Sequence, residues 1–359
     1  MKKNSLIRIA IAFVVSLLAF LFLCIGMLGS EKILHSAMRV KPYSVILSLR
    51  TYARSHDDKS PTIIYFGDST AFQPPDKSFP KSKNYRIQMG GLLNTALRED
   101  GVSPAPRVLQ FAYAGASMFD YYCLFYEAER FSPDLIIVPI NWRAFGTAWI
   151  QDENFFHPEL SALVPIFDEF SLDRSSPIRK RRISRISQIR FKILQYQLYP
   201  IGIKIWLKDN LKTHFSNQSV VRPPHLFRTD YRLDKRARQK MEEMQRQDKF
   251  FPSRIETSNI NFQSLIALAN LASLHKKKVL FFIWPLDQMK LHLDNREFER
   301  SKAVIMTAID NEYTCVLDLS NCLQPKHFAD IGMHCKVEGR REICRVLASE
   351  IKEIMEEAH

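Results

Sequence analysis

Five short apolar segments constrain the fold of this chain more than any other feature of its sequence. Each is rich in Val, Ile and Phe and is bounded by polar or turn-forming residues, which is typical of strands buried on both faces of a parallel sheet. Helical patterns separate most of them, so the alternation predicts an α/β fold with three layers, α/β/α. The expected strands are Thr62–Phe66, Val108–Ala112, Leu135–Val138, Val279–Ile283 and Cys315–Leu319, and the expected helices are Ile87–Arg98, Phe119–Arg130, Phe262–His275 and Phe298–Asn311.

A long stretch between Val138 and Val279 contains no clear buried strand. It is too long for a loop, so we expect an inserted helical subdomain at residues 145–275. Its middle, Arg174 to Lys212, is strongly basic, with apolar and aromatic residues interleaved. This pattern suits a membrane-surface element, and it equally suits a solvated helix packed on the domain.

The N-terminus contains an uncharged apolar run from Ile9 to Leu28. Twenty helical residues at about 1.5 Å each span about 30 Å, the thickness of the bilayer core. Because Lys2, Lys3 and Arg8 precede the run, the N-terminus is expected to stay in the cytoplasm and the rest of the chain to be exported. A cleaved signal peptide is the alternative, but its apolar core would be shorter and would end at a small-residue cleavage site.

These patterns predict three parts along the chain. Residues 1–29 form a cytoplasmic tip and a single transmembrane anchor, residues 30–60 a helical connector, and residues 61–359 an extracytoplasmic (periplasmic) domain that carries the insertion. The formal net charge is +13. Outside the cytoplasmic membrane such an excess favours lipid headgroups or an acidic envelope polymer over nucleic acid as partners, although it also serves solubility alone.

A candidate nucleophile follows the first predicted strand. Gly67-Asp68-Ser69 places Ser69 at the carboxyl edge of the sheet, where doubly wound folds build their sites. Three residues are a weak signal, because an ordinary turn with a helix cap has the same composition.

Three further motifs follow in the chain, and together with the first they resemble the SGNH (GDSL-type) hydrolase superfamily, whose domains are flavodoxin-like. The second is a strand leading to Gly115, the third runs from Pro133-Asp134 to Asn141, and the last contains Asp330 and His334 before a C-terminal helix. The chain departs from the superfamily pattern at Pro139 and Trp142, which stand where Gly and Asp are usual, and by one extra residue between Asp330 and His334. The resemblance covers residues 60–145 and 275–355 and leaves out the insertion.

The resemblance implies a catalytic role for each matched residue. His334 would accept the proton of the Ser69 hydroxyl, and Asp330 would orient the imidazole. The backbone amides of Ser69 and Gly115 and the side-chain amide of Asn141 would form an oxyanion hole. The alternatives are His327 as the base, a tight-turn role for Gly115, and a turn-capping role for Asn141.

The implied activity is acyl transfer through an acyl-serine, with no cofactor and no metal ion. The single anchor and the long insertion resemble the membrane-tethered branch of the superfamily, which includes the D-alanyl transfer protein of teichoic-acid modification and envelope polysaccharide O-acetyltransferases. That branch implies an acylated glycan, polymer or lipid substrate and a multispanning membrane acyltransferase as partner. An esterase or lipase on envelope lipids or acylated sugars, and a non-catalytic scaffold, are the alternatives.

Five cysteines lie in the part predicted to be exported, at positions 123, 315, 322, 335 and 344. An oxidising compartment permits disulfides, and buried free thiols are the alternative. A zinc site from Cys322, His327, His334 and Cys335 is not expected, because the spacings fit no standard zinc motif.

Overall fold

The computed structural model describes residues 61–71, 88–113, 115–151, 158–165, 249–330 and 332–356, together with six single residues (Phe13, Val15, Ser16, Pro177, Ile186 and Glu243). The chain divides into two compact units. Residues 49–192 and 231–359 form the unit that holds the sheet, and residues 1–48 and 193–230 form the other. Apart from those single residues, the predicted anchor, the connector and the basic middle of the insertion lie outside the described residues. Within the described part, no helix combines the length and apolar character needed to cross a bilayer.

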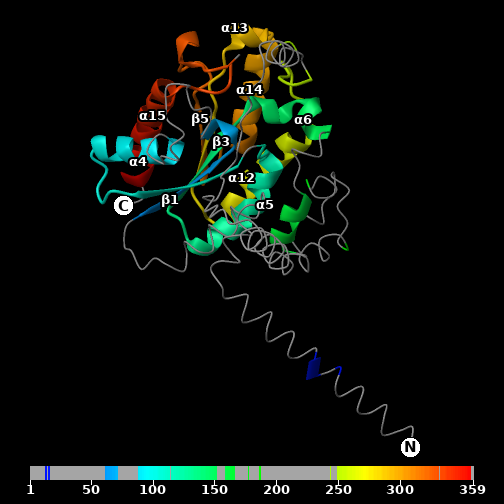
Figure 1. The fold of residues 1–359 in the computed structure, drawn as a ribbon, viewed down its shortest axis with the longest axis vertical. Helices are drawn as coiled ribbons and strands as arrows, with labels where there is room; N and C mark the ends of the chain where they lie inside the picture. The colour runs from blue at the N-terminus through cyan, green and yellow to red at the C-terminus, as the bar shows by residue number, and fades with distance from the viewer. Residues whose placement is uncertain are drawn as a thin grey trace, which may run out of the picture. The chain divides into compact units, whose positions relative to one another are not determined.

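A five-stranded parallel sheet forms the centre of the first unit (Figure 1). The strand order is β2-β1-β3-β4-β5, and every neighbouring pair is parallel. All five predicted strands are confirmed, with their ends shifted by no more than two residues. They are β1 (Thr62–Gly67), β2 (Arg107–Ala112), β3 (Leu135–Ile140), β4 (Val279–Ile283) and β5 (Thr314–Asp318).

Helices cover both faces of the sheet. Helices α4 (Met89–Glu99) and α15 (Val337–Glu356) pack together on one side, and α12 (Ile260–Leu274) packs between α5 (Met118–Ala128) and α14 (Asn295–Ile309) on the other (Figure 1). The predicted α/β architecture is therefore confirmed. Burial on both faces explains why the strands are continuously apolar: all residues of β3 and β4 are buried.

Local capping fixes where the helices on the second face begin. Ser117 and Asp120 form a capping box at the start of α5, where each side chain accepts the backbone N–H of the other residue. Asn259 caps α12 and Asp294 caps α14 through hydrogen bonds from backbone amides of the first turn. These caps set the helices in register with the strands that they cover.

The strand order places a crevice at one edge of the sheet. Strand β1 lies between β2 and β3, so the connections that leave the carboxyl ends of β1 and β3 diverge to opposite sides. Short 3₁₀ helices follow both strands there, η1 (Ser69–Ala71) and η4 (Trp142–Phe145). Gly67 permits the tight turn into η1, because an added Cβ would lie 2.8 Å from the Cβ of Ala71.

The two ends of the predicted insertion meet beside this crevice. The chain leaves the sheet through Gly146 and α6 (Thr147–Gln151), includes η6 (Pro158–Leu163), and is described again from Lys249. The amide of Ala148 donates to the carbonyl of Lys249 at 2.9 Å. A Cβ on Gly146 would lie 2.4 Å from the carbonyl oxygen of Phe250, so this close approach of two backbones requires glycine.

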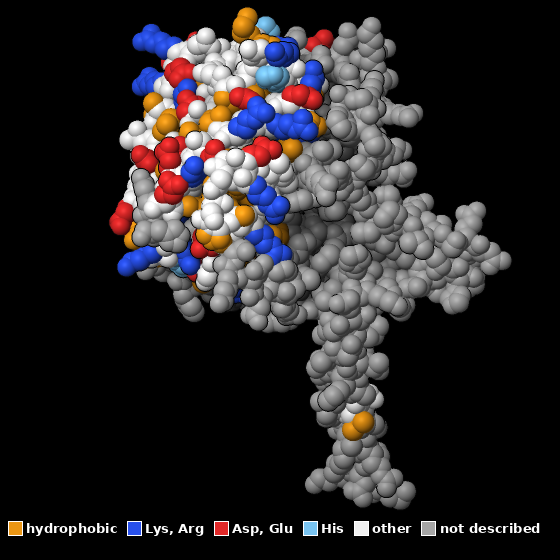
Figure 2. All heavy atoms as spheres, turned by 90° about the vertical axis from the view of Figure 1, so that its left-hand side faces the viewer, with side chains coloured by type: hydrophobic (Ala, Val, Ile, Leu, Met, Phe, Trp, Pro, Cys, Tyr) orange, Lys and Arg blue, Asp and Glu red, His pale blue; other side chains and the backbone are white. Residues whose placement is uncertain are grey.

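The surface of the described part carries charges of both signs. Figure 2 shows acidic and basic side chains interspersed over the face that it presents, rather than gathered into areas of one sign. An interspersed pattern of this kind supports solubility. The strongly basic segment at Arg174 to Lys212 lies outside the described residues, apart from Pro177 and Ile186.

Candidate active site

A serine, a histidine and an aspartate from distant parts of the chain meet at the carboxyl edge of the sheet. The Oγ atom of Ser69 lies 3.0 Å from Nε2 of His334, although 265 positions separate the two residues. The other ring nitrogen of His334, Nδ1, pairs with Oδ2 of Asp330. Nucleophile, base and orienting carboxylate are thus within hydrogen-bonding reach in the order that serine acyl transfer requires.

The loop that carries His334 folds around the Asp330 carboxylate. Its Oδ1 atom accepts the backbone amides of Gly332, Met333 and His334 at 3.0, 2.9 and 3.0 Å. The extra residue between Asp330 and His334 is absorbed in this turn, so that one carboxylate binds both the ring and the amide of His334. Burial alone would raise the pKa of Asp330, but the contacts with His334 and the backbone amides hold that pKa well below its usual range.

Gly332 lets this loop approach the neighbouring segment closely. Its φ is +155°, and a Cβ there would lie 3.1 Å from the Cβ of Asp287 and 3.1 Å from Cγ of Leu291. The carbonyl of Gly332 accepts the amide of Asp287 at 3.0 Å. The His334 loop is thereby fixed to the segment that follows β4.

The rival base predicted from the sequence lies elsewhere. His327 ends η7 (Pro325–His327), and its Cβ would lie 3.0 Å from a Cβ added to Gly339 at the start of α15. Of the two histidines, only His334 makes a hydrogen bond with Ser69 among the contacts of the described residues. The geometry therefore favours His334 over His327 as the base.

The predicted oxyanion donors also border the crevice. Ser69 is the first residue of η1, and Gly115, with φ of +83°, turns the chain after β2. The side-chain amide of Asn141 donates to Oδ2 of Asp68 at 2.7 Å, while its Oδ1 accepts the amide of Arg143 at 3.2 Å. Asn141 thus makes the turn-capping contact of the alternative interpretation, and its role as an oxyanion donor stays a prediction.

The carboxylate of Asp68 ties the two strand ends together. Its Oδ1 atom accepts from the amide and the hydroxyl of Thr70, and its Oδ2 atom accepts from Asn141 and from Nη2 of Arg143, the latter at 3.2 Å. The residue is 2% exposed. A buried carboxylate that accepts this many hydrogen bonds links the turn after β1 to the turn after β3.

Arg143 is a site residue that the sequence motifs do not predict. Its Nη2 atom lies 3.2 Å from Asp68 and 3.5 Å from Oγ of Ser69, and the residue is 8% exposed. A buried cation needs an acidic partner, and here that partner is 75 positions earlier in the chain. No local pattern in the sequence marks this pairing.

Trp142, which stands where the superfamily pattern has Asp, points away from the reacting groups. Its indole N–H donates to the carbonyl of Pro252 at 2.7 Å, and its ring packs on Phe298 with centroids 4.5 Å apart. Trp142 is completely buried. This departure from the pattern therefore anchors the turn after β3 in the core and takes no part in the site.

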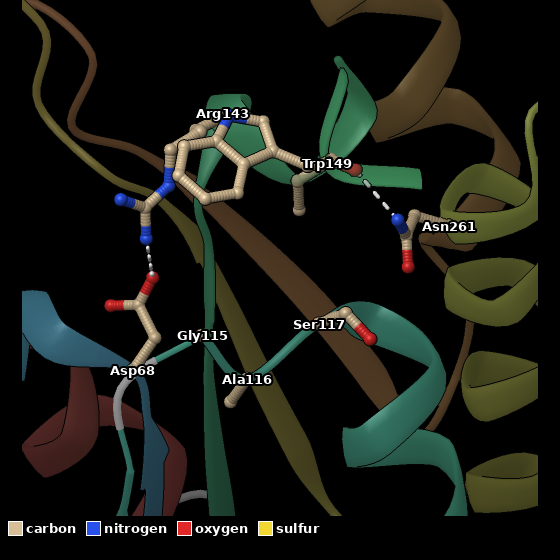
Figure 3. Close-up of a pocket in the computed structure, with 8 residues that line it drawn as sticks. Asp68, Gly115, Ala116, Ser117, Arg143, Trp149 and Asn261 are labelled. Atoms are coloured by element: carbon tan, nitrogen blue, oxygen red, sulfur yellow. Dashed lines mark hydrogen bonds and ion pairs between the residues drawn. The ribbon is translucent and has the colours of Figure 1, made fainter. Parts of the chain in front are cut away.

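A small pocket opens next to Asp68 and Arg143 (Figure 3). Asp68 and Arg143 form one wall, Gly115 and Ala116 form the floor, and Ser117 and Asn261 lie at the far end. The guanidinium of Arg143 stacks on the ring of Trp149, with its central carbon 4.3 Å from the ring centroid. The pocket thus places a fixed cation next to the candidate nucleophile. The Asn261 amide is committed to the carbonyl of Ala144 at 2.6 Å.

Four of the cysteines in the described residues, Cys315, Cys322, Cys335 and Cys344, are free thiols. Cys335 and Cys344 are buried, and Cys315 and Cys322 are partly exposed. Of the two alternatives left open by the sequence, the structure shows free thiols at these four positions. The His334 loop is therefore held by hydrogen bonds and packing rather than by a disulfide.

No model of a known protein family matches the chain, and no curated protein matches its sequence.

Proposed function

We propose that this protein is a membrane-anchored, extracytoplasmic serine acyltransferase or acyl hydrolase that works through an acyl-enzyme on Ser69. The flavodoxin-like strand order, with the site at the carboxyl edge, is consistent with the resemblance to SGNH-type enzymes. The transferred group would be an O-acyl group moving to or from a cell-envelope glycan or polymer.

The observation that carries the proposal is the Ser69–His334–Asp330 arrangement. A serine hydroxyl is a weak nucleophile until a base removes its proton, and His334 Nε2 lies 3.0 Å from Ser69 Oγ. The Asp330 contact at Nδ1 holds the ring in the tautomer that leaves Nε2 free to accept. A scaffold that had lost catalysis would have no need to keep these three groups in register.

The reaction follows from these positions in two half-reactions. Ser69 Oγ attacks the acyl carbonyl while His334 takes the hydroxyl proton, and His334 then returns that proton to the leaving alkoxide. In the second half-reaction His334 activates the incoming hydroxyl, which attacks the acyl-serine and releases Ser69. Water as acceptor makes the protein an esterase, and a glycan hydroxyl makes it a transferase.

The first test is labelling with a fluorophosphonate probe, on the full-length protein purified in mild detergent. We expect wild type to be labelled and Ser69→Ala to be unlabelled. Ser273→Ala, at the end of α12 before β4, is the matched serine control and should label like wild type. Absence of labelling in well-folded wild type would exclude the acyl-serine mechanism and leave the scaffold interpretation.

A second pair of variants tests the base. We expect His334→Ala to slow labelling by several orders of magnitude, because the hydroxyl proton then has no acceptor. His327→Ala provides the control, since that histidine lies on the α15 side of the loop. Equal losses in the two variants would contradict the assignment of His334.

The acceptor is tested by following the fate of the acyl group. With 4-methylumbelliferyl acetate, a transferase should give a burst of fluorophore and then stall until an oligosaccharide is added. An esterase should turn over steadily in water. The membrane location is tested separately, because a protein that fractionates with the membrane and resists carbonate extraction must have an anchor.

A further inference from the structure

We propose that Arg143 is a catalytic residue that donates a charged hydrogen bond to the oxyanion formed on the acyl carbonyl. This inference rests on the proposed acyl-serine mechanism and goes beyond the donors that the resemblance implies.

The position of the guanidinium is the first argument. Nη2 of Arg143 lies 3.5 Å from Ser69 Oγ and donates toward it. After attack, the oxyanion and Oγ are bonded to the same carbon atom, so a donor this close to Oγ also reaches the oxyanion. Arg143 and Gly115 line the same pocket, so the new donor belongs to the same part of the site as a predicted amide donor.

The rigidity of the guanidinium is the second argument. Asp68 fixes its Nη2 end at 3.2 Å, and Trp149 stacks on its plane (Figure 3). An oxyanion donor is effective when it is held in place before charge develops, because no reorganisation is then needed during the reaction. The residue is 8% exposed, so its charge acts through a medium that screens it less than water does.

The unused capacity of Arg143 is the third argument. A guanidinium has five N–H donors, and the hydrogen bonds of Arg143 to described side chains all come from Nη2. Within the described part of the chain, Nε and Nη1 make no hydrogen bond. Asn141, the side-chain donor predicted from the resemblance, already gives an N–H to Asp68. With respect to the described residues, Arg143 is therefore the side chain of the site that has N–H donors left over.

The same contact also selects the reactive state of Ser69. Because Arg143 donates to Oγ, the hydroxyl hydrogen of Ser69 points to the other neighbour, Nε2 of His334. The proton is then directed to its acceptor before the substrate arrives.

The test is the rate of fluorophore release from 4-methylumbelliferyl acetate by full-length Arg143→Met in mild detergent, with the oligosaccharide acceptor added so that a transferase also turns over. Loss of one oxyanion donor typically lowers kcat by about 100- to 1,000-fold, and we expect a loss of that size with KM nearly unchanged. Arg345→Met is the matched control, because the Arg345 side chain is 69% exposed on α15 and pairs with Glu342 there. A rate within threefold of wild type for Arg143→Met would overturn the assignment.

A double variant separates catalysis from mere neutralisation of Asp68. If Arg143 acts only by balancing that buried carboxylate, Asp68→Asn combined with Arg143→Met should restore the rate. We expect the double variant to stay at least as slow as Arg143→Met, because the oxyanion still lacks its charged donor. Recovery to near the wild-type rate would refute a direct role.

Comparison of two acyl groups excludes substrate recognition as the cause. If Arg143 binds an anionic group on the substrate, Arg143→Met should raise KM for the hemisuccinate ester and leave the acetate ester unaffected. We expect equal losses in kcat for both esters. Failure of the proposed function gives a different result: wild type and Ser69→Ala would then share the same background rate, and the inference would fall with it.

Discussion

Replacement of Asp330 by asparagine tests whether this carboxylate orients the imidazole of His334. Asparagine keeps an oxygen that can accept the amides of Gly332, Met333 and His334, so the loop should keep its shape. The group that faces Nδ1 of His334, however, changes from an acceptor to a donor. The ring must then carry its proton on Nε2, the nitrogen that should receive the proton of Ser69.

The loss of kcat expected for Asp330→Asn is that of a histidine held in the wrong tautomer. In serine hydrolases with this arrangement, the corresponding change lowers kcat by about 10⁴-fold, which corresponds to about 5 kcal/mol in the activation free energy. The cost in stability should be smaller. The Asp330 side chain is 28% exposed, and exchanging charged hydrogen bonds for neutral ones costs about 1–2 kcal/mol in the free energy of unfolding.

The assay is the steady-state release of fluorophore from 4-methylumbelliferyl acetate at pH 7.5, with the oligosaccharide acceptor added so that a transferase also turns over. Urea unfolding of the same preparations gives their stability. Asp294→Asn is the matched control, because Asp294 also accepts a backbone amide but caps α14, where asparagine is an equally good cap. We expect the control to keep the wild-type rate. If the kcat of folded Asp330→Asn stayed within tenfold of wild type, Asp330 would only stabilise the His334 loop, and its role in orienting the imidazole would be refuted.

Three further predictions concern the pH dependence of the Asp330 contacts, the partly exposed cysteines and Gly146. Because the pKa of Asp330 is lowered in the folded protein, its charged contacts stabilise the fold above about pH 4 and are lost as the pH falls further. The difference in unfolding free energy between wild type and Asp330→Asn should therefore shrink from pH 7 to pH 3. A constant difference would contradict this. Burial raises the pKa of Cys315 to about 11 and of Cys322 to about 12. Both thiols should therefore react with iodoacetamide at pH 8 far more slowly in the native than in the unfolded protein, and peptide mass spectrometry measures the two rates. Gly146→Ala should lower the free energy of unfolding by about 1–3 kcal/mol, because the added Cβ would lie 2.4 Å from the carbonyl oxygen of Phe250. An unchanged midpoint of urea unfolding would show that the two ends of the insertion can separate freely.

The sheet was predictable because its signal is local. A strand covered on both faces must be apolar at every position, so each run of Val, Ile and Phe marks a strand without reference to the rest of the chain. Strand ends were less predictable. Strand β3 continues through Pro139 to Ile140, where Pro139 pairs with Phe282 in the parallel register, although proline is usually excluded from central strands.

Only the site residues that belong to a sequence motif were predictable. Ser69, Asp330 and His334 lie in short segments whose order along the chain identified them, and the structure brings them together. Arg143 and the contact of Asn141 with Asp68 depend instead on how the turn after β3 meets the turn after β1. Such a meeting of distant turns is a tertiary property, and no spacing in the sequence encodes it.

Two aspartates in this site illustrate how environment assigns a role to the same side chain. Asp68 is next to the nucleophile in sequence, but both of its oxygens are taken by Thr70, Asn141 and Arg143, so it cannot act on the imidazole. The carboxylate of Asp330 binds both backbone amides and the ring of His334, so it can orient the imidazole. The buried Asp68 therefore fixes the positions of Asn141 and of Arg143, the cation that we assign to the oxyanion. Asp330 orients the base. It follows that variants of Asp68 should disturb Asn141 and Arg143 together, whereas variants of Asp330 should act through His334.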